Sequence, residues 1–179
     1  MSGRFDEAFA WARHTLERNP LNANTIFDLA WYQLHAGRLD ESAATFRKLL
    51  EFNPAFVSAQ GLYGLTLLLM GRKTEALAAA EKEYDEATKF AILTCIYWDL
   101  GRRAESDSAL AALERGFADR NAFEIAVAHS YRGEVDAAFA WLERAYQEKK
   151  GALEYMKTEP TLRNLRTDPR YQAFLRKMN

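Results

Sequence analysis

Apolar side chains recur along the chain at intervals of three and four residues, the spacing that places them on one face of an α-helix. Together with glycine and proline at the breaks, this pattern predicts helices at 4–18, 22–36, 39–52, 56–70, 73–86, 88–100, 103–116, 120–131 and 134–148. A further short helix is predicted after Asp168-Pro169, an N-cap and first helical position, because Tyr171, Phe174, Leu175 and Met178 follow at one-face spacing. The pattern therefore predicts an all-α fold.

Five of the nine glycines begin nearly the same six-residue phrase. The phrases are GRFDEA at Gly3, GRLDES at Gly37, GRKTEA at Gly71, GRRAES at Gly101 and GEVDAA at Gly133, separated by 34, 34, 30 and 32 residues. Self-similarity near a period of 34 is typical of an array in which one kind of helix pair stacks on its neighbours. The repeat predicts antiparallel pairs, each with a first helix before the glycine and a second helix after it.

Small residues occupy two fixed positions relative to these glycines. They stand five residues after the glycine at Ala8, Ser42, Ala76, Ser106 and Ala138, and seven residues before it at Ala30, Gly64, Thr94 and Ala126. Two helices approach closely only where neither carries a bulky side chain, so these positions predict the crossing point of each pair. Large residues stand just before the second set, at Leu29, Tyr63, Leu93 and Ile125.

The repeated glycine and the acids after it each have a local interpretation. A glycine that ends the first helix is expected in the left-handed region, where it has no Cβ to clash. The acids that follow stand near the start of the second helix, where the helix dipole favours negative charge. They are Asp40, Glu41, Glu75, Glu105, Glu134 and Asp136. We interpret them as caps and surface charges rather than as paired catalytic carboxylates.

Residues 3–148 resemble the tetratricopeptide repeat (TPR) family, through the small, glycine and alanine positions above and the repeat-ending Asn19-Pro20 and Asn53-Pro54. The third and fourth pairs depart from the family by lacking the closing proline, with Thr88 and Ala118 at that position. The resemblance implies a right-handed α-solenoid of antiparallel helix pairs, formed by a half repeat plus four hairpins. We expect residues 149–179 to be a capping segment of the same domain, with a detachable tail as the alternative.

The C-terminal part resembles, more narrowly, the end of TPR segments in bacterial signalling proteins. The residues that carry this likeness are the run YRGEVDAAFAWLERAYQEKKG from Tyr131, followed by Glu159-Pro160, Leu165-Arg166 and Asp168-Pro169-Arg170-Tyr171. In that group the array often follows an adenylate cyclase, winged-helix or protein kinase domain. None of those segments is visible in the sequence, so the resemblance implies the array and its cap and not the activity. Because the first helix has no partner before it, we expect a larger protein or capping by another copy.

Charge and composition disfavour several classes of binding partner and indicate the cellular compartment. Lys and Arg number 24 against 25 Asp and Glu, which disfavours nucleic acid and anionic membranes. The longest nearly apolar stretch, 59–70, is too short to span a bilayer, and the N-terminus lacks the basic and then apolar pattern of a signal peptide. With a single cysteine and hence no internal disulfide, the cytoplasm is the expected compartment.

No residue cluster predicts catalysis, a metal site or a cofactor. His14, His35 and His129 are never three or four residues apart, as two zinc ligands on one helix face would be. Cys95 stands in the apolar run AILTCIYW and is interpreted as a buried thiol, and His129 as a side chain packed between helices. No phosphate-binding glycine loop, zinc-protease box or serine elbow occurs. We therefore expect a protein that is not an enzyme and holds no metal or cofactor.

In TPR proteins the first helix of each pair lines a concave face. Carried over to this chain, the resemblance implies a peptide-binding groove lined by Phe27, Trp31, Leu65, Cys95, Trp98, Phe123, Val127 and Tyr131. Such a groove would suit an apolar helix or an extended peptide with large side chains. An EEVD-like tail is not expected, because Phe27 and Trp31 stand where a lysine and asparagine clamp would be. Alternatively, these residues are core between hairpins, since a one-residue shift in frame exchanges the two faces.

Two functions follow from these observations. The first is a protein- or peptide-binding scaffold without catalytic activity. The second is a regulatory and oligomerising segment at the C-terminal end of a larger signalling protein, in which the chain could form a homo-oligomer. In both, the partner is a protein or peptide segment.

Overall fold

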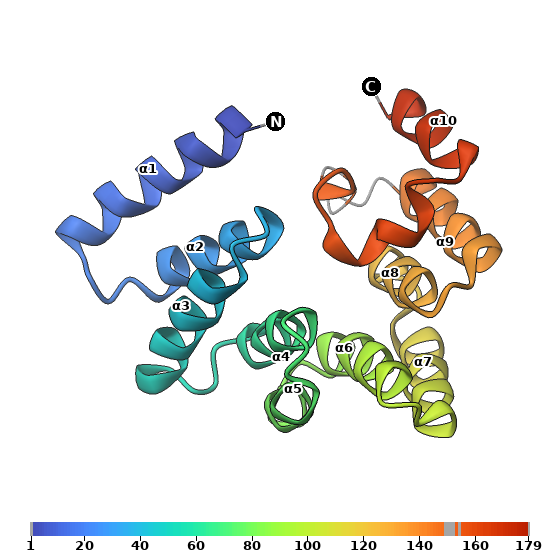
Figure 1. Ribbon diagram of the computed structural model, residues 1–179, viewed down its shortest axis with the longest axis horizontal. Helices are drawn as coiled ribbons and strands as arrows, with labels where there is room; N and C mark the ends of the chain where they lie inside the picture. Colours follow the sequence, from blue (N-terminus) through green and yellow to red (C-terminus); the bar gives the residue numbers. More distant parts are fainter. Residues whose placement is uncertain (1, 149–152, 154, 179) are drawn as a thin grey trace. The chain divides into compact units, whose positions relative to one another are not determined.

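The computed structural model describes residues 2–148, 153 and 155–178, and all regular elements within these residues are helices. The chain divides into two compact units, Met1–Ile92 and Leu93–Asn179, and the boundary falls inside α6 (Glu86–Asp99). The first unit contains α1 (Ser2–Arg18), α2 (Ala23–His35), α3 (Leu39–Phe52), α4 (Ala59–Leu69), α5 (Lys73–Ala80) and the start of α6 (Figure 1). The second contains the rest of α6, α7 (Arg103–Phe117), α8 (Ala122–Arg132), α9 (Val135–Gln147), the 3₁₀-helix η2 (Pro160–Leu165) and α10 (Pro169–Lys177).

The prediction of an all-α fold built from packed antiparallel helix pairs is confirmed, with α2 against α3, α4 against α5 and α8 against α9. Nearly every predicted helix agrees with the structure to within three residues at each end. The exception is 73–86, for which the prediction is too long because α5 ends at Ala80. The expected cap at Asp168 is confirmed, because its side chain accepts a hydrogen bond from the N–H of Arg170 at the start of α10.

The glycine after each first helix closes that helix in the predicted left-handed conformation, with φ between 74° and 80° at Gly37, Gly71, Gly101 and Gly133. At Gly37 the glycine N–H donates to the carbonyl of Leu34, and the next N–H, of Arg38, donates to that of Gln33. The same pair of bonds recurs at the other three glycines. This arrangement satisfies carbonyls that the end of a helix would otherwise leave without a donor.

The small residues meet where the sequence predicts the helices to cross. In the pairs α2–α3 and α6–α7 the serine of the second helix donates to a carbonyl of the first: Ser42 Oγ to Ala30 O and Ser106 Oγ to Thr94 O, both at 2.8 Å. In α4–α5, a Cβ added to Gly64 would lie 3.0 Å from the carbonyl oxygen of Ala76. Larger side chains at these positions would force the helices apart.

In α3, α5 and α7 the acids stand in the first turn of the helix and not at its N-cap position. The N-cap residues of α3, α5 and α7 are arginines without a side-chain capping bond. Each arginine instead pairs with the glutamate three residues later: Arg38–Glu41 at 3.6 Å, Arg72–Glu75 at 2.6 Å and Arg102–Glu105 at 2.9 Å. These exposed pairs contribute little to stability, because water screens them. They account for the arginine and glutamate of the phrases at Gly37, Gly71 and Gly101.

Glu83 lies in the turn between the end of α5 and the start of α6. Its side chain is 3% exposed, and its carboxylate accepts hydrogen bonds from four backbone N–H groups: Ser58 at 3.1 Å, Gly61 at 2.8 Å, Tyr84 at 2.9 Å and Asp85 at 2.8 Å. Because Gly61 lies in the first turn of α4, Glu83 caps that helix from a different part of the chain. A buried carboxylate thus ties the α5–α6 turn to the start of α4.

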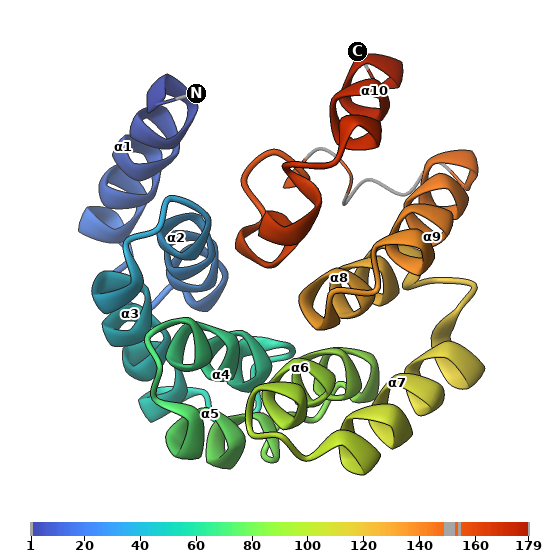
Figure 2. The ribbon, with the colours of Figure 1, turned by 45° about the vertical axis from the view of Figure 1, so that its right-hand side comes forward.

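The C-terminal segment packs on α8 and α9 of the second unit (Figure 2). Met156, Leu162 and Leu165 are fully buried in one cluster with side chains of α8 and α9. A polar contact joins the segment to α8 as well, since Asn164 Nδ2 donates to Ser130 O at 2.9 Å. Residues 149–152, 154 and 179 of the predicted capping segment lie outside the described residues. The described part of the segment completes the core of the second unit.

Candidate functional site

In the first unit, one face of α2 carries Asp28, Trp31 and His35, which are three and seven residues apart and so lie on the same side of the helix. All three side chains are half-buried. The rings of Trp31 and His35 are in contact, with centroids 4.0 Å apart, and Tyr32 lies edge-on to Trp31 at 5.5 Å. This is a surface with a large aromatic ring beside a carboxylate and an imidazole.

The two other predicted groove residues of this unit belong to its core. Phe27 packs between Phe46 and Phe56, with ring centroids 6.0 and 5.1 Å away. Leu65 is only 4% exposed. Of the two interpretations that the sequence left open, core packing applies to Leu65 and largely to Phe27, because their positions turn toward the neighbouring hairpin and not toward solvent.

Asp28 carries an electrostatic cost, since partial burial raises the pKa of its carboxyl above the ordinary value. Its ionised form is thus less stable in the folded than in the unfolded protein. This penalty is absent below the pKa of the unfolded state and develops as the pH rises through the folded pKa. We therefore expect Asp28→Asn to stabilise the protein at pH 7 and to have no effect at pH 3. Urea denaturation at the two pH values checks this, with the exposed Asp40→Asn as control; lower stability of Asp28→Asn at pH 7 would contradict it.

In the second unit, Trp98 lies against arginines of its own chain. The guanidinium of Arg103 lies 3.4 Å from the centroid of the indole ring and that of Arg132 lies 4.8 Å away. Arg132 is held in place by Asp107 and Glu134, at 2.6 and 2.7 Å. The half-buried indole is therefore a packing partner for fixed cations.

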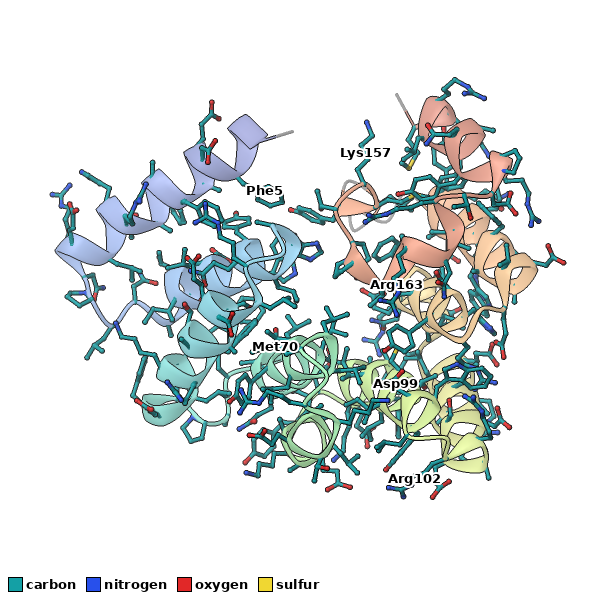
Figure 3. All side chains as sticks on the ribbon, in the orientation of Figure 1. Phe5, Met70, Asp99, Arg102, Lys157 and Arg163 are labelled. Carbon is teal, nitrogen blue, oxygen red and sulfur yellow. The ribbon has the colours of Figure 1, made fainter. Side chains whose placement is uncertain are left out.

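Tyr131, on α8, is half-buried among polar groups of the second unit. Burial raises the pKa of its phenol, and a hydrogen bond to the carboxylate of Asp99 adds to the shift. Asp99 lies at the end of α6 and Arg163 in η2, with its guanidinium 6.0 Å from the Tyr131 ring (both are labelled in Figure 3). The tyrosine hydroxyl is therefore neutral at physiological pH and donates its hydrogen bond to Asp99.

The remaining groove residues of this unit face the C-terminal segment. Phe123 is 6% exposed and forms one cluster with Met156 and Leu162, and Val127 packs against the same cluster. Core packing again applies to Phe123. On α8, the chain's own C-terminal segment occupies the positions that the TPR resemblance assigns to a peptide.

Cys95 and His129 are both buried in the second unit. Cys95 is 1% exposed, and burial raises the pKa of its thiol. His129 is 8% exposed and lies between two carboxylates, with Nδ1 2.6 Å from Glu134 and Nε2 2.9 Å from Glu114. It thereby joins α7, α8 and the start of α9. Within the described residues, no three histidine, cysteine or acidic side chains could hold a metal ion together, and no helix is both long and apolar enough to cross a membrane.

The sequence pattern identifies Trp31 but misses Asp28 and His35 beside it. A signal for both is present in the sequence, because residues three before and four after a helical tryptophan share its face. Neither residue is apolar, so a groove predicted from apolar positions alone leaves them out.

The fold is a TPR-like array of helical hairpins. No protein-family model matches the sequence, and no curated protein is significantly similar to it. Solved structures are similar in fold. TTC0263, a thermophilic TPR protein of Thermus thermophilus, has a TM-score of 0.67 at 18% identity, over 97% of this chain and 91% of that one. MamA has a TM-score of 0.57 at 19% identity, over 86% of this chain and 94% of that one. YrrB, described as a TPR protein with an unusual peptide-binding site, has a TM-score of 0.53 at 14% identity, over 93% of this chain and 97% of that one.

Proposed function

We propose that this protein is a non-catalytic scaffold that binds a segment of another protein, and that the contact surface in its first unit is Asp28, Trp31 and His35 of α2. The observation that carries the proposal is the half-buried tryptophan beside a carboxylate whose pKa is raised by burial. Desolvated aromatic side chains supply much of the free energy at protein interfaces. In the second unit, we propose that Tyr131 contributes to binding beside Arg163.

The charge of Asp28 selects the partner. A carboxylate that has lost part of its hydration gains most from a cation, because a charge-assisted hydrogen bond replaces the lost water. We therefore propose a peptide with a large apolar side chain next to a lysine or arginine. The apolar side chain contacts Trp31, and the basic one pairs with Asp28. A TPR-like fold, such as that of YrrB, is compatible with peptide binding.

A displayed peptide library tests this proposal on the full chain. Selection is expected to enrich peptides that combine an aromatic or large aliphatic residue with an adjacent basic residue. A selected peptide should bind Trp31→Ala and Asp28→Asn at least about tenfold more weakly, a loss of roughly 1.4 kcal/mol. The matched controls are the exposed Tyr84→Ala and Asp40→Asn, which should bind like the wild type. Selection of no sequence, or equal binding to all four variants, would contradict the proposal.

The second hypothesis from the sequence is a regulatory and oligomerising segment of a bacterial signalling protein. It is compatible with the same binding surface, but it also predicts that the protein associates with itself. Light scattering across a range of concentrations distinguishes the two. A monomer at every concentration would contradict the oligomerising part and leave the binding function in place.

A further inference from the structure

His129 of α8 is a buried histidine with a carboxylate at each of its two ring nitrogens. Its Nδ1 lies 2.6 Å from Oε2 of Glu134, the N-cap residue of α9, and its Nε2 lies 2.9 Å from Oε1 of Glu114 in α7. With only 8% of the residue exposed, the ring has these carboxylates as partners where an exposed histidine would have water. The ring therefore bridges three helices of the second unit through its two nitrogens.

The two contacts need more protons than a neutral imidazole carries. A neutral ring has one N–H donor and one nitrogen with a lone pair, whereas an ionised carboxylate can only accept. One contact would then place a lone pair against a carboxylate oxygen at hydrogen-bond distance. A carboxyl group releases its proton at a lower pH than an imidazole does, so the missing proton resides on the ring. In that form each nitrogen of His129 donates a charge-assisted hydrogen bond to one carboxylate.

The charged groups around the ring favour the same form. Glu134 also accepts a hydrogen bond from Arg132 at 2.9 Å, and Arg132 pairs with Asp107 of α7 at 2.6 Å. With Glu114, three carboxylates thus lie around one arginine. When the ring is neutral, these groups have three negative charges against one positive charge, and protonation of the ring reduces this excess by one. A nearby excess of negative charge favours uptake of a proton.

The other charged groups near α8 lie on a different side of the helix. Asp99 of α6 and Arg163 of η2 are placed at Tyr131, two residues after His129, and residues two apart do not share a face of a helix. Within the described residues, the hydrogen bonds between the C-terminal segment and the adjoining Ser130 involve uncharged groups. The carboxylates of α7 and of the start of α9 therefore determine which form of the ring the fold favours.

We propose that His129 is a proton-dependent clamp, which in its charged form holds α7 to α8 and to the start of α9, and in its neutral form releases one of the two carboxylates. Folding supplies two acceptors that the unfolded chain lacks, so it favours the protonated ring. The resulting stabilisation is complete below about pH 6.5, where a histidine in an unfolded chain gains its proton, and is lost as the pH rises further. The clamp does not involve Asp28 or Trp31, so it is independent of the proposed function.

The first measurement follows the histidine ring nitrogens of the full, ¹⁵N-histidine-labelled chain by NMR between about pH 5 and 9. His129 is expected to bind its second proton at least about tenfold more tightly than His14, which is exposed on α1. Glu114→Gln should reduce this difference, because a neutral amide replaces one carboxylate. The matched control Glu105→Gln, at an exposed position of the same helix, should leave it unchanged.

The second measurement is the urea midpoint at about pH 6 and about pH 8.5, on either side of the expected change. The midpoint of the wild type and of His14→Gln should fall more over this interval than that of His129→Gln, which cannot gain the proton. Equal proton affinity of His129 and His14, an affinity unaltered by Glu114→Gln, or the same pH dependence in the wild type and His129→Gln would each overturn the proposal. The NMR comparison holds even if His129→Gln does not fold, because it uses the wild type and a variant of the partly exposed Glu114.

Discussion

Replacing Glu83 with alanine is expected to destabilise the protein by about 3 kcal/mol, because four backbone N–H groups lose their acceptor at a buried site. The loss includes the cap of α4 and the anchor of the α5–α6 turn. Glu83→Gln should cause a smaller loss, because one of the two acceptor oxygens is retained as the amide oxygen. Urea denaturation followed by circular dichroism measures the change in the free energy of unfolding.

The matched control for Glu83 is Glu51→Ala, at an exposed position near the end of α3. A surface substitution of this kind should change stability by less than about 0.5 kcal/mol. If Glu83→Ala and Glu51→Ala had equal effects, the carboxylate would not be the cap that its four hydrogen bonds indicate.

Replacing Leu165 with alanine is expected to cost about 2–5 kcal/mol, the usual range for leaving a cavity in a close-packed core. Leu165 is fully buried in the cluster that joins the C-terminal segment to α8 and α9. The prediction separates a structural cap from a detachable tail, because a detachable tail could lose this side chain with little effect on the free energy of unfolding. Thermal and urea denaturation both measure the change in the free energy of unfolding that Leu165→Ala causes.

Leu21→Ala serves as the control for the same chemical change on the surface, since Leu21 is 64% exposed. A loss for Leu165→Ala no greater than for Leu21→Ala would show that the C-terminal segment does not hold the second unit together. In that case the positions of Phe123 and Val127 on α8 would be accessible to a partner after release of the segment.

The helices and their crossings could be predicted from the sequence because local chemistry determines them. Gly37 and its three equivalents provide the left-handed residue that ends each first helix. The small residues indicate the helix crossings because only small side chains fit there. Asp168 caps α10 by accepting a hydrogen bond from the N–H of Arg170, two residues later. Each of these features depends on residues nearby in the sequence or on the repeat. The sequence pattern is therefore sufficient to predict them.

The end of α5 and the role of Glu83 could not be predicted in this way. In the sequence, Glu83 is one of several charges in the run EKEYDE, and nothing local distinguishes it from a surface acid. Its burial depends on Ser58 and Gly61, more than twenty residues away. The 30-residue spacing between Gly71 and Gly101 was the available signal that this repeat is built differently.

The candidate site was only partly predictable because exposure depends on what the next hairpin covers. Trp31 and Leu65 occupy similar positions by repeat alignment, but Leu65 is buried and Trp31 is half-exposed to solvent. Phe123 is buried by the C-terminal segment, which breaks the period and whose packing the repeat pattern does not describe. The repeat thus identifies a face of each helix, and tertiary packing decides whether that face is open.

The most direct test of the binding function is a titration of the ¹⁵N-labelled protein with a library-selected peptide, followed by the amide resonances. Binding through the proposed surface predicts chemical-shift changes in α2, between Asn24 and His35, and their loss in Asp28→Asn. Binding that leaves the α2 resonances unchanged, with shifts confined to other helices, would contradict the assignment of this surface.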